Sequence, residues 1–234
     1  MDRDAEGVTF LIKPGIHRLQ SVVPKSGNRF IGEPGAILSG ARLLSSLSRD
    51  GDAWVAANQT QEGPKGYGQG ALSPAGVEYK EATYPEDLYI DDQPLLQAGD
   101  RASVAPGKFY FDYAGDTIDF ADDPTGRRIE ASVTQVAFHC GKDIGCRDIN
   151  IQNLIIEKYA CPAQHGAVHA RTGYAGPLSE NWTVSDPEIR LNPSTANDDV
   201  STEYDDMKVT VHETSTTRAH GVPVRNEARP DSAR

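Results

Sequence analysis

A short motif returns at a fixed interval near the start of the chain. FLIKPG at residues 10–15 reappears as FIGEPG at residues 30–35, an offset of 20 that aligns Phe10 with Phe30 and one Pro-Gly turn with the next. A period of this length is typical of stacked supersecondary units, each of which buries its apolar face only against its neighbour. The apolar stretches between the turns are too short for helices, so we expect strands. Leucine-rich repeats have a similar period, but their L-x-x-L-x-L spacing is missing here.

A second repeat lies downstream, between residues 148–159 (DINIQNLIIEKY) and 181–192 (NWTVSDPEIRLN), at an offset of 33. Apolar residues alternate with polar ones in both segments, as half-buried strands require. Asn153 aligns with Asp186 at a bend, and both residue types tolerate a left-handed backbone and can stack into ladders at a corner. The aligned apolar pairs are Ile149 with Trp182, Ile151 with Val184, and Ile156 with Ile189.

The middle of the chain has a different pattern. Residues 45–83 include GPKGYGQG at 63–70, and we expect a loop with few apolar anchors. Beyond it, Phe109, Phe111 and Tyr113 alternate along the sequence, the chain turns at Ala114–Asp116, and alternation resumes, which is the pattern of a β-hairpin. Residues 88–136 are therefore predicted to form antiparallel strands, with Gly115 in a tight turn.

These patterns predict an all-β chain in four parts. Residues 1–44 form the first coils of a solenoid, 45–136 a loop plus an antiparallel β insertion, and 137–192 resumed coils whose inner residues point into a shared core. Residues 193–234 contain few large apolar side chains, so we expect a disordered tail with one strand-like piece at Met207–Val211.

Four segments, residues 17–44, 106–130, 153–170 and 181–192, resemble bacterial right-handed parallel β-helix repeat proteins of the pectate-lyase-like superfamily. The resemblance covers about Gly7 to Asn192 and is more specific to architecture than to activity. It implies a right-handed parallel β-helix interrupted by a β-rich insertion. It also implies an extracellular location, a polysaccharide partner, and lyase or glycoside hydrolase activity in a full-length protein. Calcium is implied by the resemblance alone.

The chain departs from the family pattern after about Asn192. The family continues there with a His-Gly turn and further coils, whereas this sequence continues with PSTANDD. We interpret the change as truncation or frameshift and expect this chain alone to be inactive. The catalytic Lys or Arg base and the acidic calcium ligands of pectate lyases match no motif here, so no catalytic, cofactor or metal residue is assigned. A non-catalytic carbohydrate-binding or structural β-solenoid module is the alternative function.

Charge and composition limit the kinds of partner that the chain is expected to bind. The formal net charge is −11 and the pI about 4.9, which opposes binding to a phosphate backbone, so no nucleic-acid partner is expected. No apolar run is long enough for membrane insertion, the N-terminus lacks the pattern of a signal peptide, and no protein partner is indicated. The cysteines are Cys140, Cys146 and Cys161; either a Cys140–Cys146 bridge or buried thiols would fit.

Polar candidates for a site fall into two groups. His165 and His169 would share a strand face and could approach one metal ion, although no third ligand is indicated and ordinary turn histidines are the alternative. A dense group of aspartates could supply the carboxylates of glycoside hydrolysis or a calcium site. Their turn positions favour solvated hairpin ends instead. These aspartates are Asp91, Asp92, Asp112, Asp116, Asp119, Asp122 and Asp123.

Aromatic residues and an arginine pair complete the candidates. Arg127 and Arg128 could meet a uronate carboxylate or could simply be a solvated loop. The aromatic group could form a sugar-stacking platform, or the alternating members could be the core of the insertion. This group comprises Tyr89, Phe109, Tyr110, Phe111 and Tyr113.

Overall fold

The computed structural model describes residues 5–62, 71–72, 78–79, 84–140, 145–161, 166–170, 179–191, 200–201, 209–212 and 215–217. Its regular structure in this part is β-strand, apart from a single 3-10 turn, η2 (Arg101–Ser103). No helix within these ranges is long and apolar enough to cross a membrane.

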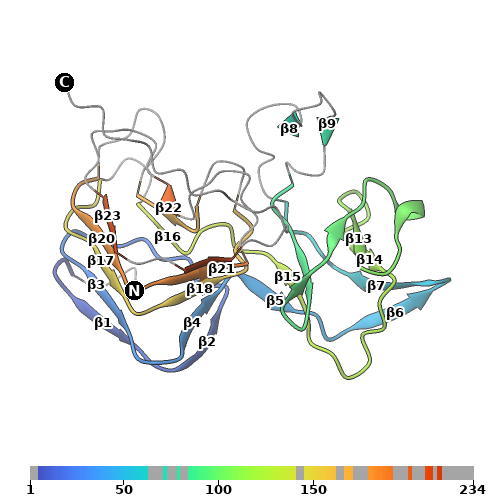
Figure 1. Cartoon of the computed structure of the whole chain (residues 1–234), viewed down its shortest axis with the longest axis horizontal. Coiled ribbons are helices and arrows are strands. Elements are labelled where there is room, and N and C mark those ends of the chain that lie inside the picture. Colours follow the sequence, from blue (N-terminus) through green and yellow to red (C-terminus); the bar gives the residue numbers. More distant parts are fainter. Residues whose placement is uncertain are drawn as a thin grey trace.

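Three parallel sheets form the left part of the molecule in Figure 1. The first has the order β1 (Thr9–Ile12), β3 (Arg29–Gly32), β17 (Asn150–Gln152), β20 (Trp182–Ser185), β23 (Val209–His212). The second has the order β2 (Gly15–Arg18), β4 (Ala36–Ser39), β18 (Ile155–Glu157), β21 (Glu188–Arg190), β24 (Ser215–Thr217). The third has the order β16 (Phe138–His139), β19 (Val168–His169), β22 (Val200–Ser201).

Successive passes of the chain supply these sheets in turn. The second pass, for example, gives β3, β4 and β16, and the third gives β17, β18 and β19. The first pass adds β1, β2 and a bridge from Val22 to Phe138. We call each pass a coil and the whole the coil stack.

The two repeats define the register between coils. Phe10 pairs with Phe30 at the offset of 20 in β1 and β3, and Ile151 pairs with Val184 at the offset of 33 in β17 and β20. Ile156 pairs with Ile189 in the second sheet. The predicted parallel pairing is therefore confirmed. Between β2 and β4 the register differs by one from the repeat alignment, because Gly15 pairs with Ala36 and donates its backbone N–H to Gly35.

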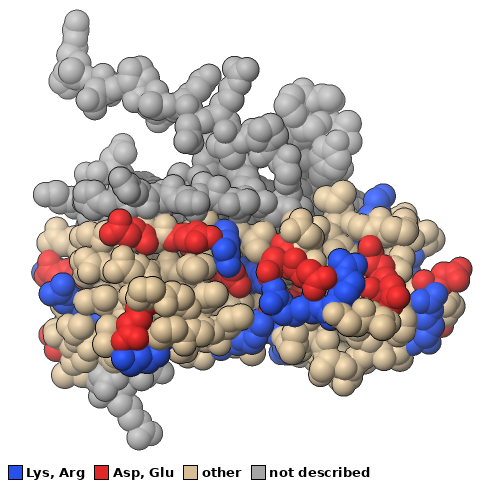
Figure 2. All heavy atoms as spheres, turned by 60° about the horizontal axis from the view of Figure 1, so that its bottom comes forward, with Lys and Arg blue, Asp and Glu red and all other residues tan. Residues whose placement is uncertain are grey.

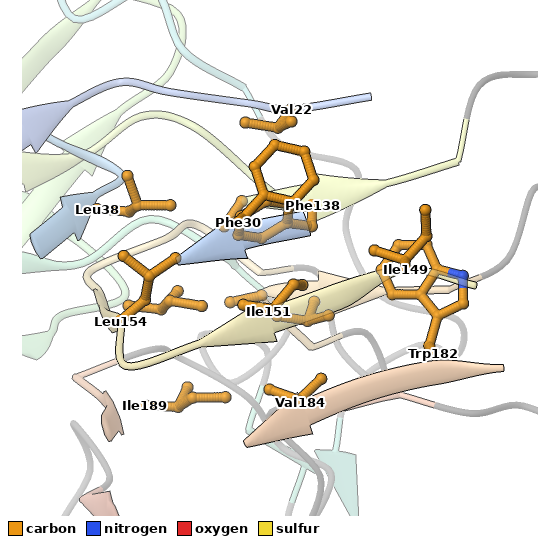
Figure 3. Packing of buried hydrophobic residues seen from close by; sticks show 14 of the residues in the cluster. Val22, Phe30, Leu38, Phe138, Ile149, Ile151, Leu154, Trp182, Val184 and Ile189 are labelled. Carbon is orange, nitrogen blue, oxygen red and sulfur yellow. The ribbon is translucent and has the colours of Figure 1, made fainter. Parts of the chain in front are cut away.

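Inward side chains of successive coils form the core of the stack. Phe30, Ile151 and Val184 lie in one column (Figure 3), each at most 1 % exposed. Ile156 and Ile189 are equally buried, as predicted. Phe10 is only partly buried, because it belongs to the first coil and has a neighbour on one side, where its ring stacks on Phe30 at 4.9 Å between centroids.

Corners between strands use the left-handed backbone predicted for them. Asn153 and Asp186 have φ values of 53° and 49°. At another corner the amide of Asn181 donates to the carboxylate of Asp148 in the coil before it, over 2.9 Å. These side chains form a short polar ladder on the outside of the stack.

The insertion forms a second lobe beside the coil stack (Figure 1) with a core of its own. One sheet has the order β11 (Gln93–Pro94), β10 (Leu88–Ile90), β15 (Ile129–Ser132), β5 (Ala41–Leu43). The other has the order β12 (Leu96–Gln97), β13 (Lys108–Asp112), β14 (Thr117–Phe120), β7 (Ala53–Ala57), β6 (Leu47–Asp50). A small pair, β8 (Ala71–Leu72) and β9 (Glu78–Tyr79), is antiparallel.

Most of these strands are antiparallel, and Gly115 lies in the turn between β13 and β14, as predicted. Two features correct the sequence analysis. β12 and β13 are parallel. Residues 47–57 are not a loop but the hairpin of β6 and β7, whose two-residue loop is Gly51-Asp52, with Gly51 at a left-handed φ of 62°.

The expectation of a disordered tail is wrong for three short strands. β22, β23 and β24 pair in parallel with β19, β20 and β21, so they continue the sheets by one more strand each. The predicted piece Met207–Val211 overlaps β23. A physical reason is that the edge strands of the last complete coil have unpaired backbone N–H and C=O groups. A short segment with β-branched residues can form hydrogen bonds with these groups. The other residues of 193–234 lie outside the described part of the chain.

Candidate functional site

Charged side chains gather where the insertion meets the coil stack. Figure 2 shows acidic and basic residues side by side in the middle of the molecule, between the two lobes. We define the junction cluster as Arg18, Asp92, Arg128, Glu130, Glu157, Lys158, Glu188 and Arg190, which are joined by ion pairs.

Lys158 is the centre of the junction cluster on the coil side. It follows β18 at a corner, with a left-handed φ of 56°. Its side chain is only 1 % exposed, and its ammonium group contacts the carboxylates of Asp92 and Glu130. The ammonium also lies 5.4 Å from the centre of the Tyr89 ring, close enough for a cation–π interaction.

Glu130 is the corresponding centre on the insertion side. It lies on β15, is 1 % exposed, and accepts contacts from Lys158, from Arg18 at 2.6 Å and from Arg128 at 3.2 Å. Arg18 and Lys158 come from two different coils. A single buried carboxylate therefore ties the insertion to two levels of the coil stack.

The cluster continues outward along the second sheet. Glu157 accepts from Arg190 of the next coil at 2.8 Å, and Arg190 also reaches Glu188 at 2.6 Å. The exposed end consists of Arg128 and Asp92. Burial acts to raise the pKa of Asp92, but hydrogen bonds from Lys158 and Arg128 outweigh it, and the pKa is lowered.

Tyr89 closes the junction from the insertion side. Its hydroxyl lies 2.6 Å from the carbonyl oxygen of Leu191 and 3.1 Å from the carboxylate of Asp87. Burial, together with the nearby charge of Asp87, holds the pKa of this hydroxyl well above its usual value. Tyr89 therefore stays neutral and does not form part of an exposed aromatic platform.

The ion pairs of the junction cluster hold strands in position. The cluster contains four carboxylates and four cations, and each carboxylate has a cationic partner within the cluster. A proton donor or base in hydrolysis needs a carboxyl group that can reach substrate. Asp92 and Glu130 instead link the insertion to the coil stack, and Glu157 and Glu188 pair with Arg190 within the stack.

Two sequence candidates meet at the edge of the junction. The Asp91 carboxylate accepts hydrogen bonds from the Nε–H of Arg127 at 2.8 Å and from the backbone N–H of Arg128 at 2.9 Å. Asp92 forms an ion pair with Arg128. The hydrogen bond from Arg127 is the main cause of the lowered pKa of Asp91. The acidic pair and the arginine pair are thus partners of each other, which neither pattern predicted.

The remaining aspartates mostly serve turns. Asp112 accepts the backbone N–H of Ala114 and Gly115 within the hairpin turn. Asp122 accepts from the Gly107 backbone and Asp123 from Thr125, while Asp116 has a left-handed φ of 54°. Asp119 is buried and pairs with Arg101 at 2.7 Å. The structure does not bring these carboxylates together into one site.

Aromatic candidates also have structural partners. Phe109 and Phe111 belong to the core of the insertion, and Tyr113 packs against it. The Tyr113 hydroxyl donates to Glu86 at 2.8 Å, and burial raises its pKa. Tyr110 lies on the same strand between the two phenylalanines and is half-buried.

Only one histidine of the predicted pair lies within the described residues. His169 is buried on β19 and lies beside His139 of β16 in the parallel register, whereas His165 lies outside the described residues. No group of three or more potential metal ligands occurs among the residues that the structure describes.

Cys140 and Cys146 form a disulfide, which resolves the alternative left open by the sequence, and Cys161 is a buried free thiol. Ser179 Oγ lies 2.8 Å from the Cys140 sulfur, and the indole N–H of Trp182 donates to the Cys146 carbonyl at 3.1 Å. The bridge thus lies between the second and third coils, and Ser179 and Trp182 of the next coil contact it.

Sequence reasoning missed Lys158, Glu130 and Glu157. One pattern could have indicated Lys158, because its corner is occupied by leucine in other coils: Leu19 after β2 and Leu191 after β21 share its left-handed backbone. A charged residue at a position that is apolar in neighbouring repeats needs a partner from elsewhere.

No protein-family model and no curated protein matches the chain. Among solved structures, the chain is similar to that of XylC in complex with xylose, with a TM-score of 0.59 and 14 % identity over 80 % of this chain and 35 % of XylC. A second structure, titled a glycoside hydrolase, matches with a TM-score of 0.34 and 10 % identity over 80 % of this chain and 54 % of that one. The first match shows a likeness of fold, and the second is too distant to support an argument. This chain therefore spans about a third of the length of XylC and about half of the other protein.

Proposed function

We propose that the chain is a right-handed parallel β-helix module of a protein that acts on an extracellular polysaccharide, as a lyase or a glycoside hydrolase. The observation that carries the proposal is the coil stack, in which successive coils place their strands in register in three parallel sheets. Right-handed crossovers are the ones that twisted parallel strands strongly favour.

Two further findings support a carbohydrate role and an extracellular location. The fold is similar to that of XylC, a protein solved with xylose bound. The Cys140–Cys146 disulfide suits an oxidising compartment. We also infer that the module is organised as two blocks of coils, predicted from the sequence as residues 1–44 and 137–192, around the insertion. The first block ends at about Gly40 rather than residue 44, because β5 (Ala41–Leu43) pairs with β15 of the insertion.

A non-catalytic carbohydrate-binding or structural module is the second candidate, and one observation favours it. Each carboxylate of the junction cluster is paired with a cation, and three of the other aspartates accept backbone hydrogen bonds in turns. The carboxylates of the junction cluster and these three aspartates thus have structural partners already. On this proposal the module binds glycan without cleaving it.

Incubation with polysaccharides tests both candidates. The chain is mixed with pectate, alginate and xylan, and three readouts are followed: ultraviolet absorbance from unsaturated products of a lyase, new reducing ends from a hydrolase, and retention on a glycan array. Turnover supports the first candidate, and binding without turnover supports the second. If the chain neither binds nor cleaves any of these polymers, that result contradicts a carbohydrate function for this chain. Parallel assays with added calcium and with a chelator test the calcium dependence that the family resemblance implies.

A further inference from the structure

Two histidines lie side by side in the third parallel sheet of the coil stack. His139 of β16 pairs with His169 of β19 in the parallel register, one coil apart. The residues before them, Phe138 and Val168, form the preceding register pair and belong to the buried core. Successive side chains of a strand point to opposite faces, so both imidazoles lie on the outer face of this sheet. The sequence linked His169 with His165 instead, because those two are close in the chain.

The packing of Phe138 determines which way the neighbouring imidazole points. The Phe138 ring is buried inside the coil stack, where it meets the ring of Phe30 at 5.0 Å between centroids (Figure 3). Cys140, the next inward position, is also buried. His139 lies between these two inward residues and is half-buried, whereas His169 is only 8 % exposed. One imidazole is therefore accessible to a small solute, and the other lies beside it, largely withdrawn from water.

A hydrogen bond orients the imidazole of His139. Its Nδ1 lies 3.0 Å from the backbone carbonyl oxygen of Cys140. A carbonyl oxygen only accepts, so Nδ1 carries the proton, and in the neutral ring the lone pair is on Nε2. Histidines that bind metals almost always donate their other ring N–H in this way, which fixes the ring and strengthens the ligand. The disulfide between Cys140 and Cys146 holds the accepting residue in place.

We propose that His139 and His169 together bind one divalent transition-metal ion, of the zinc and copper type, on the outer face of the third sheet. Neighbouring strands are about 4.8 Å apart. Two imidazole nitrogens at about 2.0–2.1 Å from one zinc ion lie about 3.3 Å from each other, a separation that rings on adjacent strands reach by leaning together. Imidazole is a preferred ligand of these ions, whereas calcium prefers oxygen ligands.

The two imidazoles leave the metal ion with open positions. No third His, Cys, Asp or Glu side chain joins the pair among the residues that the structure describes. Within this part of the chain, the remaining positions fall to water or to an oxygen atom of a bound ligand. Such a site binds its ion more weakly than a closed structural site with four protein ligands, and the ion can exchange its other ligands. The inference is independent of the carbohydrate function.

Calorimetric titration of the metal-free chain with zinc tests the proposal. We expect one zinc ion to bind per chain. His139→Gln and His169→Gln should each weaken binding about tenfold or more, because the loss of a ligand costs at least as much as the loss of its outer hydrogen-bond partner. His17→Gln is the matched control and should leave binding unchanged: a ring nitrogen of His17 also lies 2.8 Å from a backbone carbonyl oxygen, but its register partner is Leu38. Absence of zinc binding, or an equal loss in the control, would overturn the proposal.

Copper identifies the ligands separately. Electron paramagnetic resonance with one equivalent of Cu²⁺ should show two imidazole nitrogens on the ion in the unmodified chain and one in His139→Gln. A nitrogen lost in His165→Gln but not in His139→Gln would return the site to the pair expected from the sequence and overturn the assignment.

Thermal unfolding shows whether each variant keeps its fold, which matters because His169 is largely buried. Zinc should raise the melting temperature of the unmodified chain and of His17→Gln, since an ion that binds only the folded state stabilises it. It should leave the melting temperature of folded His139→Gln unchanged, and the same rise in all three proteins would contradict the site.

Discussion

The coil stack and the insertion achieve a buried core in opposite ways. In the coil stack no coil covers its own inner face, and each inner residue is buried by the coils above and below it, as Ile151 is by Phe30 and Val184. In the insertion, hairpins such as β13–β14 fold back on themselves, and the core forms between neighbouring segments of one stretch of chain. The comparison teaches that damage should spread along the stack but remain local in the insertion.

The largest expected effect compares one buried phenylalanine from each region. Phe30→Ala and Phe120→Ala both remove a ring that is at most 1 % exposed, so each should cost about 3–5 kcal/mol of unfolding free energy. Hydrogen exchange should increase in β1 and β17 as well as β3 for Phe30→Ala. For Phe120→Ala the increase should be confined to the insertion. Equal spread in both variants would remove the distinction between the two regions.

The junction cluster links the regions, and breaking it should have the next largest effect. Glu130→Ala leaves Lys158 and Arg18 without their shared buried carboxylate and should cost about 3 kcal/mol, since removing one partner strands the other charge. The double variant Glu130→Leu with Lys158→Met removes both charges and should cost less. Urea denaturation measures both changes. A double variant that is less stable than Glu130→Ala would contradict this account.

Removal of the disulfide should have a smaller effect, on the coil stack alone. Cys140 and Cys146 are 6 residues apart, and the chain-entropy model gives about 2 kcal/mol for such a short loop. The double variant Cys140→Ser with Cys146→Ser should show this loss in the coils, with unchanged exchange in β13 and β14. A reducing agent should destabilise the unmodified chain and leave the double variant unaffected; the same shift in both would point to another cause.

The smallest effect concerns acid stability at the edge of the junction. The folded-state pKa of Asp92 lies below its usual value, so its contribution is complete above the pKa of a free aspartate, about 3.9. That contribution is lost as the pH falls through the lower folded value. Because Asp92 is partly exposed, the contribution should stay under about 1 kcal/mol. Thermal unfolding between about pH 5 and 2 should therefore depend less on pH in Asp92→Asn, and identical slopes would count against the pairing.

The sequence predicted the coil stack better than the junction. Repeats such as Phe10 with Phe30 carry the register directly, because identical spacing in sequence becomes neighbouring strands in space. The hairpin around Gly115 could be predicted equally well from the sequence, because its contacts are between residues close together in the chain. Of the tail strands, β23 overlaps the predicted piece Met207–Val211, whereas β22 and β24 were missed because they gain their pairing from the coil before them rather than from their own apolar content.

The junction cluster could not be predicted from the sequence, because the residues that pair in it are far apart in the chain and follow no repeat. Lys158 meets Asp92 and Glu130 across 66 and 28 residues of sequence, and pairing of this kind depends on how the insertion docks. Asp91, Asp92, Arg127 and Arg128 were recognised as candidates, but only docking shows that they neutralise one another.

Gly40 marks the point where the chain leaves the coil stack for the insertion, and the chain returns to the same point. The backbone N–H groups of Val133 and Thr134 both donate to the Gly40 carbonyl, at 3.1 and 3.0 Å. A Cβ at Gly40 would come within 2.6 Å of the Tyr159 Cα, so only glycine fits this crossing. Since the two ends meet, β4 pairs with β18 as though nothing separated them. Such a crossing is a natural grafting point in evolution: the segment between can be lengthened, exchanged or lost, at a loop-closure cost that grows only logarithmically with its length.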